Sequence, residues 1–169
     1  SGARIPTGAL VRLLRARRFD LFHDPMPDVA SFEGYAGETE SVLFQLSAML
    51  LNGGEELPGD AAGHFGVARA LVGHLRAFGY NASRGRVFLP LNVFAANGVS
   101  EEAILGGQDG PELQAALGQV GDMALEHLTK GELALAELPR PTRAAFAVTA
   151  ILRPQLTLLR RDGKPFSLP

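Results

Sequence analysis

The 169-residue sequence contains no cysteine, no tryptophan and only two tyrosines. Without cysteine the chain has no disulfide framework, no thiolate metal site and no cysteine nucleophile, which fits a reducing compartment. No apolar run approaches the length of a membrane-spanning helix. We therefore expect a cytoplasmic protein whose contact with an inner membrane, where it occurs, is peripheral.

An excess of either charge is also lacking. Sixteen Lys and Arg stand against 18 Asp and Glu, for a net charge of −2, so we expect no nucleic-acid partner. The sequence is rich in Ala, Gly and Arg, which is typical of a GC-rich bacterial genome. Composition predicts no particular oligomeric state.

Strand signals are scarce: the best one, Val87–Leu89, ends at Pro90. Apolar residues make up 46% of the chain and elsewhere recur with a helical period. We therefore predict one all-α domain over residues 1–169, a bundle of seven or eight helices. The expected helices cover 7–18, 28–35, 42–51, 60–80, 91–97, a short turn from 100, 111–138 and 143–161.

Capping residues and prolines set the expected helix ends. Thr7, Asp28 and Ser100 are candidate N-caps, and Pro111 suits a first helical position. Pro154 is expected to kink the last helix, and residues 163–169 to form an extended tail.

Two Asp-x-x-x-Asp pairs, Asp20 with Asp24 and Asp24 with Asp28, have a spacing that could share Mg²⁺ on one helical face. Pro25 and Pro27 interrupt the helix that both pairs would need. We expect a loop there, with Asp28 as a cap. The four histidines are scattered along the sequence, and no Walker or Rossmann phosphate loop is present.

Two groups of arginines stand out. The first lies on the helix predicted over 7–18 and is either a solvated face or a contact for anionic lipid or an acidic partner: Arg12, Arg15, Arg17 and Arg18. The second, Arg76, Arg84 and Arg86, lies in the stretch LRAFGYNASRGRVFLP, residues 75–90. Its guanidinium groups suit phosphate oxygens, and equally suit tying the loop to nearby carbonyls and carboxylates.

The same stretch resembles the second aspartate-rich region of squalene/phytoene synthases, roughly LRDVGEDARRGRIYLP. The segments that begin at Pro25 and Leu91 resemble the neighbouring family segments, so the resemblance runs from about Asp20 to about Gly163. It implies an all-α bundle of the isoprenoid synthase type around a central cavity. It also implies head-to-head joining of two prenyl diphosphates, assisted by Mg²⁺ on two aspartate-rich motifs. The matching residues are Leu75, Arg76, Gly79, Ala82, Arg84, Gly85, Arg86, Leu89 and Pro90.

This chain departs from the family pattern where the metal would bind. Ala77 and Asn81 stand at the paired aspartates, and Tyr80 replaces the glutamate between them. Ala70 and Gly73 stand where the family shows a glutamine and an asparagine. The positions 70, 73, 77 and 81 share one helical face, which cannot hold a hard cation with these side chains. We therefore predict no catalytic residue, no metal site and no cofactor.

The other aspartate motif belongs before the region that matches residues 5–20, so we expect the bundle to lack its N-terminal helices. An open apolar side would then need a partner, a membrane or self-association to cover it. The stretch 75–90 resembles a non-catalytic branch of the family, which includes a mitochondrial complex I assembly factor, more than it resembles the enzymes.

Three functions stay open at this point. The sequence favours a non-catalytic module that binds protein or lipid, with a role in respiratory complex I assembly. The second is an active Mg²⁺-dependent prenyltransferase that takes carboxylates from Glu38, Glu40 or Asp60, or from an upstream segment. The third is isoprenoid lipid binding without turnover. The candidate diphosphate- or anion-binding residues are Arg76, Tyr80, Asn81, Arg84 and Arg86.

Overall fold

The computed structural model describes residues 5–166, and in that range the chain is helical without any strand. The elements are α1 (Thr7–Ala16), η1 (Arg17–Leu21), α2 (Val29–Ala36), η2 (Gly37–Ser41), α3 (Val42–Leu51), α4 (Asp60–Arg76), α5 (Phe78–Ser83), α6 (Leu91–Ala96), α7 (Glu101–Leu105), α8 (Pro111–Glu137), η3 (Arg140–Ile151) and α9 (Leu152–Asp162).

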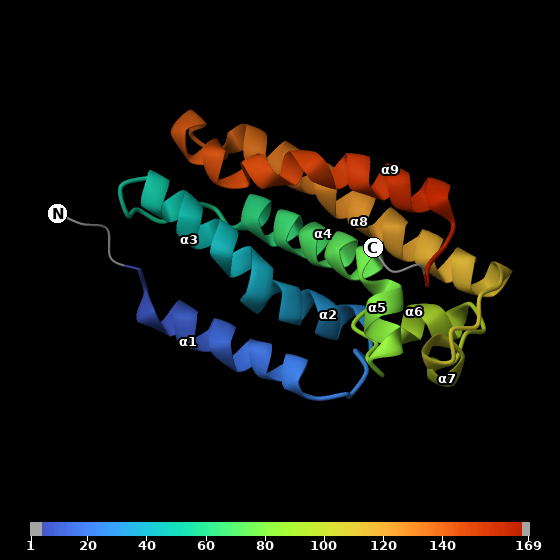
Figure 1. Ribbon diagram of the computed structural model, residues 1–169. Coiled ribbons are helices and arrows are strands. Elements are labelled where there is room, and N and C mark those ends of the chain that lie inside the picture. Colours follow the sequence, from blue (N-terminus) through green and yellow to red (C-terminus); the bar gives the residue numbers. More distant parts are fainter. Residues whose placement is uncertain (1–4, 167–169) are drawn as a thin grey trace.

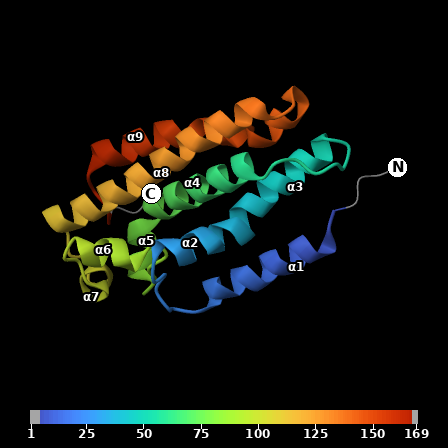
Figure 2. The same cartoon turned by 180° about the vertical axis from the view of Figure 1, so that it is seen from behind.

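The long helices form a bundle in which α4 is central. Figures 1 and 2 show α1 along one edge and α8 with α9 along the other, with α2–α3 and α4 between them. The short helices α5, α6 and α7 gather at one end of the bundle. This arrangement leaves α4 in contact with α8, η2, α3 and α9, so a residue on α4 can face several neighbours.

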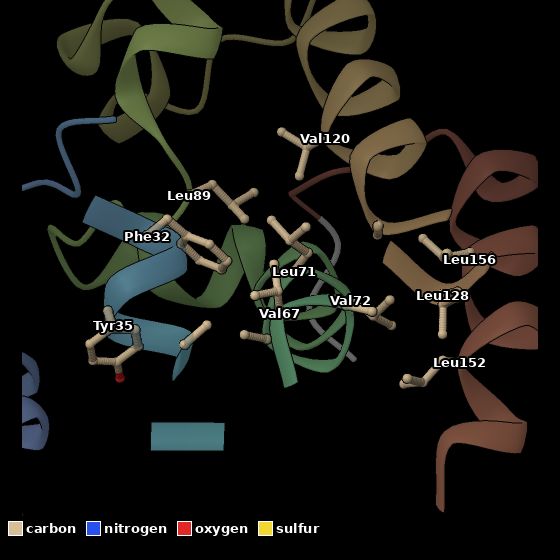
Figure 3. Packing of buried hydrophobic residues seen from close by; sticks show 14 of the residues in the cluster. Phe32, Tyr35, Val67, Leu71, Val72, Leu89, Val120, Leu128, Leu152 and Leu156 are labelled. Carbon is tan, nitrogen blue, oxygen red and sulfur yellow. The ribbon is translucent and has the colours of Figure 1, made fainter. Parts of the chain in front are cut away.

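Small residues allow α4 to approach its neighbours closely. Gly66 lies against the backbone of Ser41 in η2, and Gly131 of α8 lies against the ring of Phe65. The larger α4 side chains fill the core: Leu71 is fully buried, and Figure 3 shows it beside Phe32 of α2. The core therefore fixes the rotation of α4, and with it the face that α4 turns away from the core.

Several predicted features are confirmed. Asp28 caps α2 by accepting a hydrogen bond from Ser31 N at 2.7 Å, and this bond lowers the pKa of Asp28. Ser100 caps α7 through Ala103 N, and Pro111 opens α8. Thr7 is not a cap: it is the first helical residue, and Pro6 holds the cap position without a side-chain bond.

Helix continuity differs from prediction at three places. The helix expected over 60–80 breaks at Ala77, whose φ of −93° and ψ of 12° separate α4 from α5. The segments expected as separate helices over 28–35 and 42–51 instead run together through the π-helical turn η2. The final helix is 3₁₀ up to Ile151, and Pro154 lies in the first turn of α9. A proline cannot donate a hydrogen bond to the carbonyl four residues before it and clashes with that carbonyl, so Pro154 favours a break in the α-helix near the end of η3.

None of the helices between residues 5 and 166 combines the length and apolar character that a membrane crossing requires. The predicted extended tail begins at Gly163, which has a positive φ of 54°, and its last three residues lie outside the described range. Phe166 packs on Phe78 of α5 with ring centroids 5.5 Å apart, so the described part of the tail is folded against the bundle.

Candidate functional site

A cavity of about 410 Å³ lies between α4, α5, η3 and α9, and η1 and η2 contribute one residue each to its wall. Its apolar side consists of Val148, Ile151 and Leu152. Val148 and Ile151 are about half exposed, at 45% and 50%, so the cavity opens to solvent on that side.

The opposite side carries the stripe predicted from the sequence. Ala70, Gly73, Ala77 and Asn81 all line the cavity, although α4 ends before Ala77. A Cβ added at Gly73 would meet no heavy atom within 4 Å, so this part of the wall is hollow. The stripe offers one amide and no carboxylate.

A network of buried and half-buried polar groups closes the end of the cavity near η1 and η2. Arg17 donates to Tyr35 Oη at 3.0 Å and to Glu40 Oε1 at 2.9 Å. Tyr35 in turn donates to Asp20 Oδ1 at 2.6 Å. Arg69 of α4 forms an ion pair with the second oxygen of Glu40. Four segments therefore meet at one carboxylate and one phenol.

Burial changes the protonation of two groups here. Tyr35 is desolvated and hydrogen-bonded to Asp20, and both effects raise its pKa, so it stays neutral. Burial lowers the pKa of His74 to about 4, because its ring stacks on Phe88 and meets Phe32 edge-on. His74 therefore adds no charge to the cavity at neutral pH.

The donor set does not fit Mg²⁺, the ion that the family resemblance implies. Among the described residues that line the cavity, Glu40 is the only carboxylate, and guanidinium groups of Arg17 and Arg69 hold both its oxygens. A hard cation prefers several oxygen ligands and would have to displace both arginines. The other carboxylates considered lie elsewhere: Glu38 pairs with Arg12 at 3.4 Å, and Asp60 is exposed at the start of α4.

The five candidate anion-binding residues divide into two groups. Arg76, Tyr80 and Asn81 line the cavity. Arg84 and Arg86 do not: the guanidinium of Arg84 lies 4.6 Å over the Tyr80 ring, and Arg86 donates to Asp20 O at 2.9 Å. Of the two roles expected for Arg86, binding of phosphate oxygens or attachment of the loop to a nearby carbonyl, the structure shows the second. Anion binding by these residues stays a prediction.

Sequence reasoning missed most of the polar network. Arg17 was expected on a solvated face or at a contact with lipid or a partner, whereas the structure places it half-buried between Tyr35 and Glu40. Arg69 had one available signal, because positions 69, 73 and 76 share a helical face with the stripe. Arg17 and Glu40 are 23 residues apart in the sequence, and no local sequence pattern predicts their contact.

The sequence is similar to those of known proteins. The sequence profile described as squalene/phytoene synthase matches residues 2–168. The chain is also similar to "NADH dehydrogenase (ubiquinone) complex I, assembly factor 6", with 29% identity over 152 residues to the Rattus norvegicus protein and 29% over 153 residues to that of Homo sapiens. Each alignment covers 90% of this chain and 46% of the relative. The chain therefore spans about half the length of the curated relatives it matches.

Solved structures show the same fold. Squalene synthase HpnC from Alicyclobacillus acidocaldarius superposes with a TM-score of 0.82 at 15% identity, over 94% of this chain and 61% of that one. A dehydrosqualene synthase, solved in complex with a ligand, gives a TM-score of 0.77 at 22% identity, over 96% of this chain and 58% of that one. The predicted bundle of the isoprenoid synthase type is confirmed.

Proposed function

The chain belongs to the squalene/phytoene synthase family, and from this premise we propose that it is a non-catalytic member that acts in the assembly of respiratory complex I. One observation carries the proposal: the wall formed by Ala70, Gly73, Ala77 and Asn81 presents no carboxylate to the cavity. Glu40, the nearest substitute, is neutralised by two arginines. The names of the relatives, which are complex I assembly factors, indicate the process in which we propose that it acts.

An assembly factor acts by contacting other proteins, so the proposal requires a protein partner. It requires neither Mg²⁺ nor any other cofactor. A bacterial source and peripheral contact with the membrane in which the complex is built belong to the same proposal. Vesicle flotation of the full chain, with and without anionic lipid, tests the membrane contact directly.

The first experiment separates a binding module from an enzyme. Purified protein is incubated with farnesyl diphosphate and Mg²⁺, and the extract is analysed for a head-to-head C30 product. We expect none, and in thermal unfolding we expect no stabilisation that depends on Mg²⁺. A C30 product, or a Mg²⁺-dependent rise in melting temperature, contradicts the non-catalytic assignment.

The second experiment tests the process. The gene is deleted in its host, and complex I is measured by native gel and by NADH:ubiquinone activity. We expect both to fall, and the wild-type gene to restore them. Normal complex I in the deletion strain contradicts the assembly role, whatever the outcome of the product assay.

A cavity-filling pair of variants links the two experiments. Gly73→Leu places a side chain in the cavity, whereas Gly63→Leu places one in open space on the same helix. If the cavity serves assembly, only Gly73→Leu fails to restore complex I. If both variants restore complex I equally, a surface other than the cavity performs the assembly function.

One observation favours isoprenoid lipid binding as a second function. The cavity has Arg17, Arg69 and Arg76 on one side and the apolar residues Val148 and Ile151 on the other, which suits a chain with an anionic head. Farnesyl diphosphate should then stabilise the protein without Mg²⁺. At a hundred times the dissociation constant the gain is about 2.7 kcal/mol. Arg76→Gln should reduce it, whereas Arg84→Gln, outside the cavity, should not.

A further inference from the structure

Two histidines far apart in the sequence meet between α4 and α8. Nδ1 of His64 lies 3.1 Å from Nδ1 of His127, and the ring centroids are 5.2 Å apart. The four histidines are scattered along the sequence, and no local pattern predicts that these two meet. The pair lies outside the cavity described above and plays no part in the proposed function.

The separation of the two nitrogens matches two ligands of one metal ion. Imidazole nitrogens bind Zn²⁺ at 2.0–2.1 Å, so two of them on one tetrahedral ion lie about 3.3 Å apart, with ring centroids about 5.2 Å apart. A hydrogen bond between two neutral rings produces a similar separation. Titration with a metal ion distinguishes a ligand pair from a hydrogen-bonded pair.

A carboxylate lies on the far side of one ring. Oε1 of Glu33, on α2, lies 3.3 Å from Nε2 of His127. A carboxylate at Nε2 holds the proton there and leaves the Nδ1 lone pair directed at His64. Metal-binding histidines typically have such a carboxylate behind the ring.

We propose that His64 and His127 form a two-imidazole site for a borderline transition-metal cation such as Cu²⁺, Ni²⁺ or Zn²⁺. The ion would link α4 to α8, Glu33 would orient the His127 ring, and water would occupy the remaining coordination positions of the ion. In the part of the chain that the structure describes, no cluster of three or more His, Cys, Asp or Glu side chains is arranged to hold a metal. The site therefore rests on two protein ligands, and imidazole nitrogen selects against Mg²⁺.

The test is isothermal titration calorimetry of the tag-free full chain with Zn²⁺ and with Cu²⁺. We expect one site per chain, tighter for Cu²⁺ than for Zn²⁺. Zn²⁺ at a hundred times its dissociation constant should raise the melting temperature by about 5–10 °C. Electron paramagnetic resonance of the Cu²⁺ complex should show two coupled nitrogens.

Three variants make the assignment specific. His64→Gln should abolish the site, and Glu33→Gln should keep both ligands but weaken binding by about 10–100-fold. His23→Gln changes an exposed histidine elsewhere and should bind as the wild type does. Unchanged affinity in folded His64→Gln, or no binding by the wild type, overturns the proposal. If His64→Gln fails to fold, unchanged affinity in Glu33→Gln or a copper spectrum without two nitrogens overturns it instead.

Discussion

Gly66 provides the sharpest test of how the cavity wall is held in place. A Cβ at this position would lie 2.5 Å from Ser41 N and 2.6 Å from Ser41 Cα, both backbone atoms that cannot rotate away. Gly66→Ala must therefore push η2 away from α4. Overpacking of this kind costs about 1–3 kcal/mol net. Because η2 carries Glu40, the same displacement should weaken its ion pair with Arg69.

Gly63 is the matched control, because it lies one turn earlier on α4 and an added Cβ meets nothing within 4 Å. Gly63→Ala should gain up to about 1 kcal/mol from helix propensity alone. The two variants should thus differ by roughly 5–15 °C in melting temperature for a chain of this size. Urea denaturation of both variants measures the difference as a free energy of unfolding. Equal stability of the two variants would refute the close approach of η2 to α4.

Three further predictions concern single contacts. Burial lowers the pKa of His74 from 6.5 to about 4, so as the pH falls His74 takes up a proton in the unfolded protein before it does so in the folded protein. This contribution to the free energy of unfolding is complete above about pH 6.5 and falls by about 3 kcal/mol towards pH 4. In urea denaturation at a series of pH values, His74→Phe should lose this part of the pH dependence. Tyr35→Phe removes the hydroxyl that donates to Asp20 and should lower the free energy of unfolding by about 1 kcal/mol, measured by urea denaturation; a cost near zero would mean that the phenol contributes no net hydrogen bond. At Gly79 an added Cβ would lie 2.6 Å from Phe166 Cα, so Gly79→Ala should release the C-terminal segment and speed its proteolysis, whereas unchanged cleavage would contradict that docking.

The sequence carried more information about the stripe than about the wall opposite it. The spacing of residues 70, 73, 77 and 81 was enough to place them on one face, because helical geometry is local. They all line the cavity even though the helix breaks at Ala77. The resemblance in residues 75–90 then predicted what such a face does in related enzymes and what this one lacks.

The polar network could not be predicted in the same way. Arg17, Tyr35, Glu40 and Arg69 come from four elements, and each contact depends on how those elements pack. Arg17 also looked like its exposed neighbours on a basic helix. Long-range pairing is decided by tertiary packing, so a single sequence shows it only where a motif marks both partners, and none marks these.

Helix type was equally hard to foresee. The segment 140–151 has a helical pattern, yet it is 3₁₀ until three residues before Pro154. The π-helical turn η2 lies between two segments that each look like an ordinary helix start or stop. Neither deviation changes which residues are apolar, so a pattern of apolar residues does not reveal them.

The π-helical turn η2 makes this part of the chain tolerant of one change in length. A π turn fits one more residue into a turn than an α-helix does. Deleting one residue from 37–41 should therefore restore an ordinary helix, leave the orientation of α3 relative to α2 nearly unchanged and keep Phe44 and Met49 buried. Deleting a second residue would rotate α3 by about 100° and turn both side chains out of the core. Two deletions in this segment should therefore destabilise the protein far more than one.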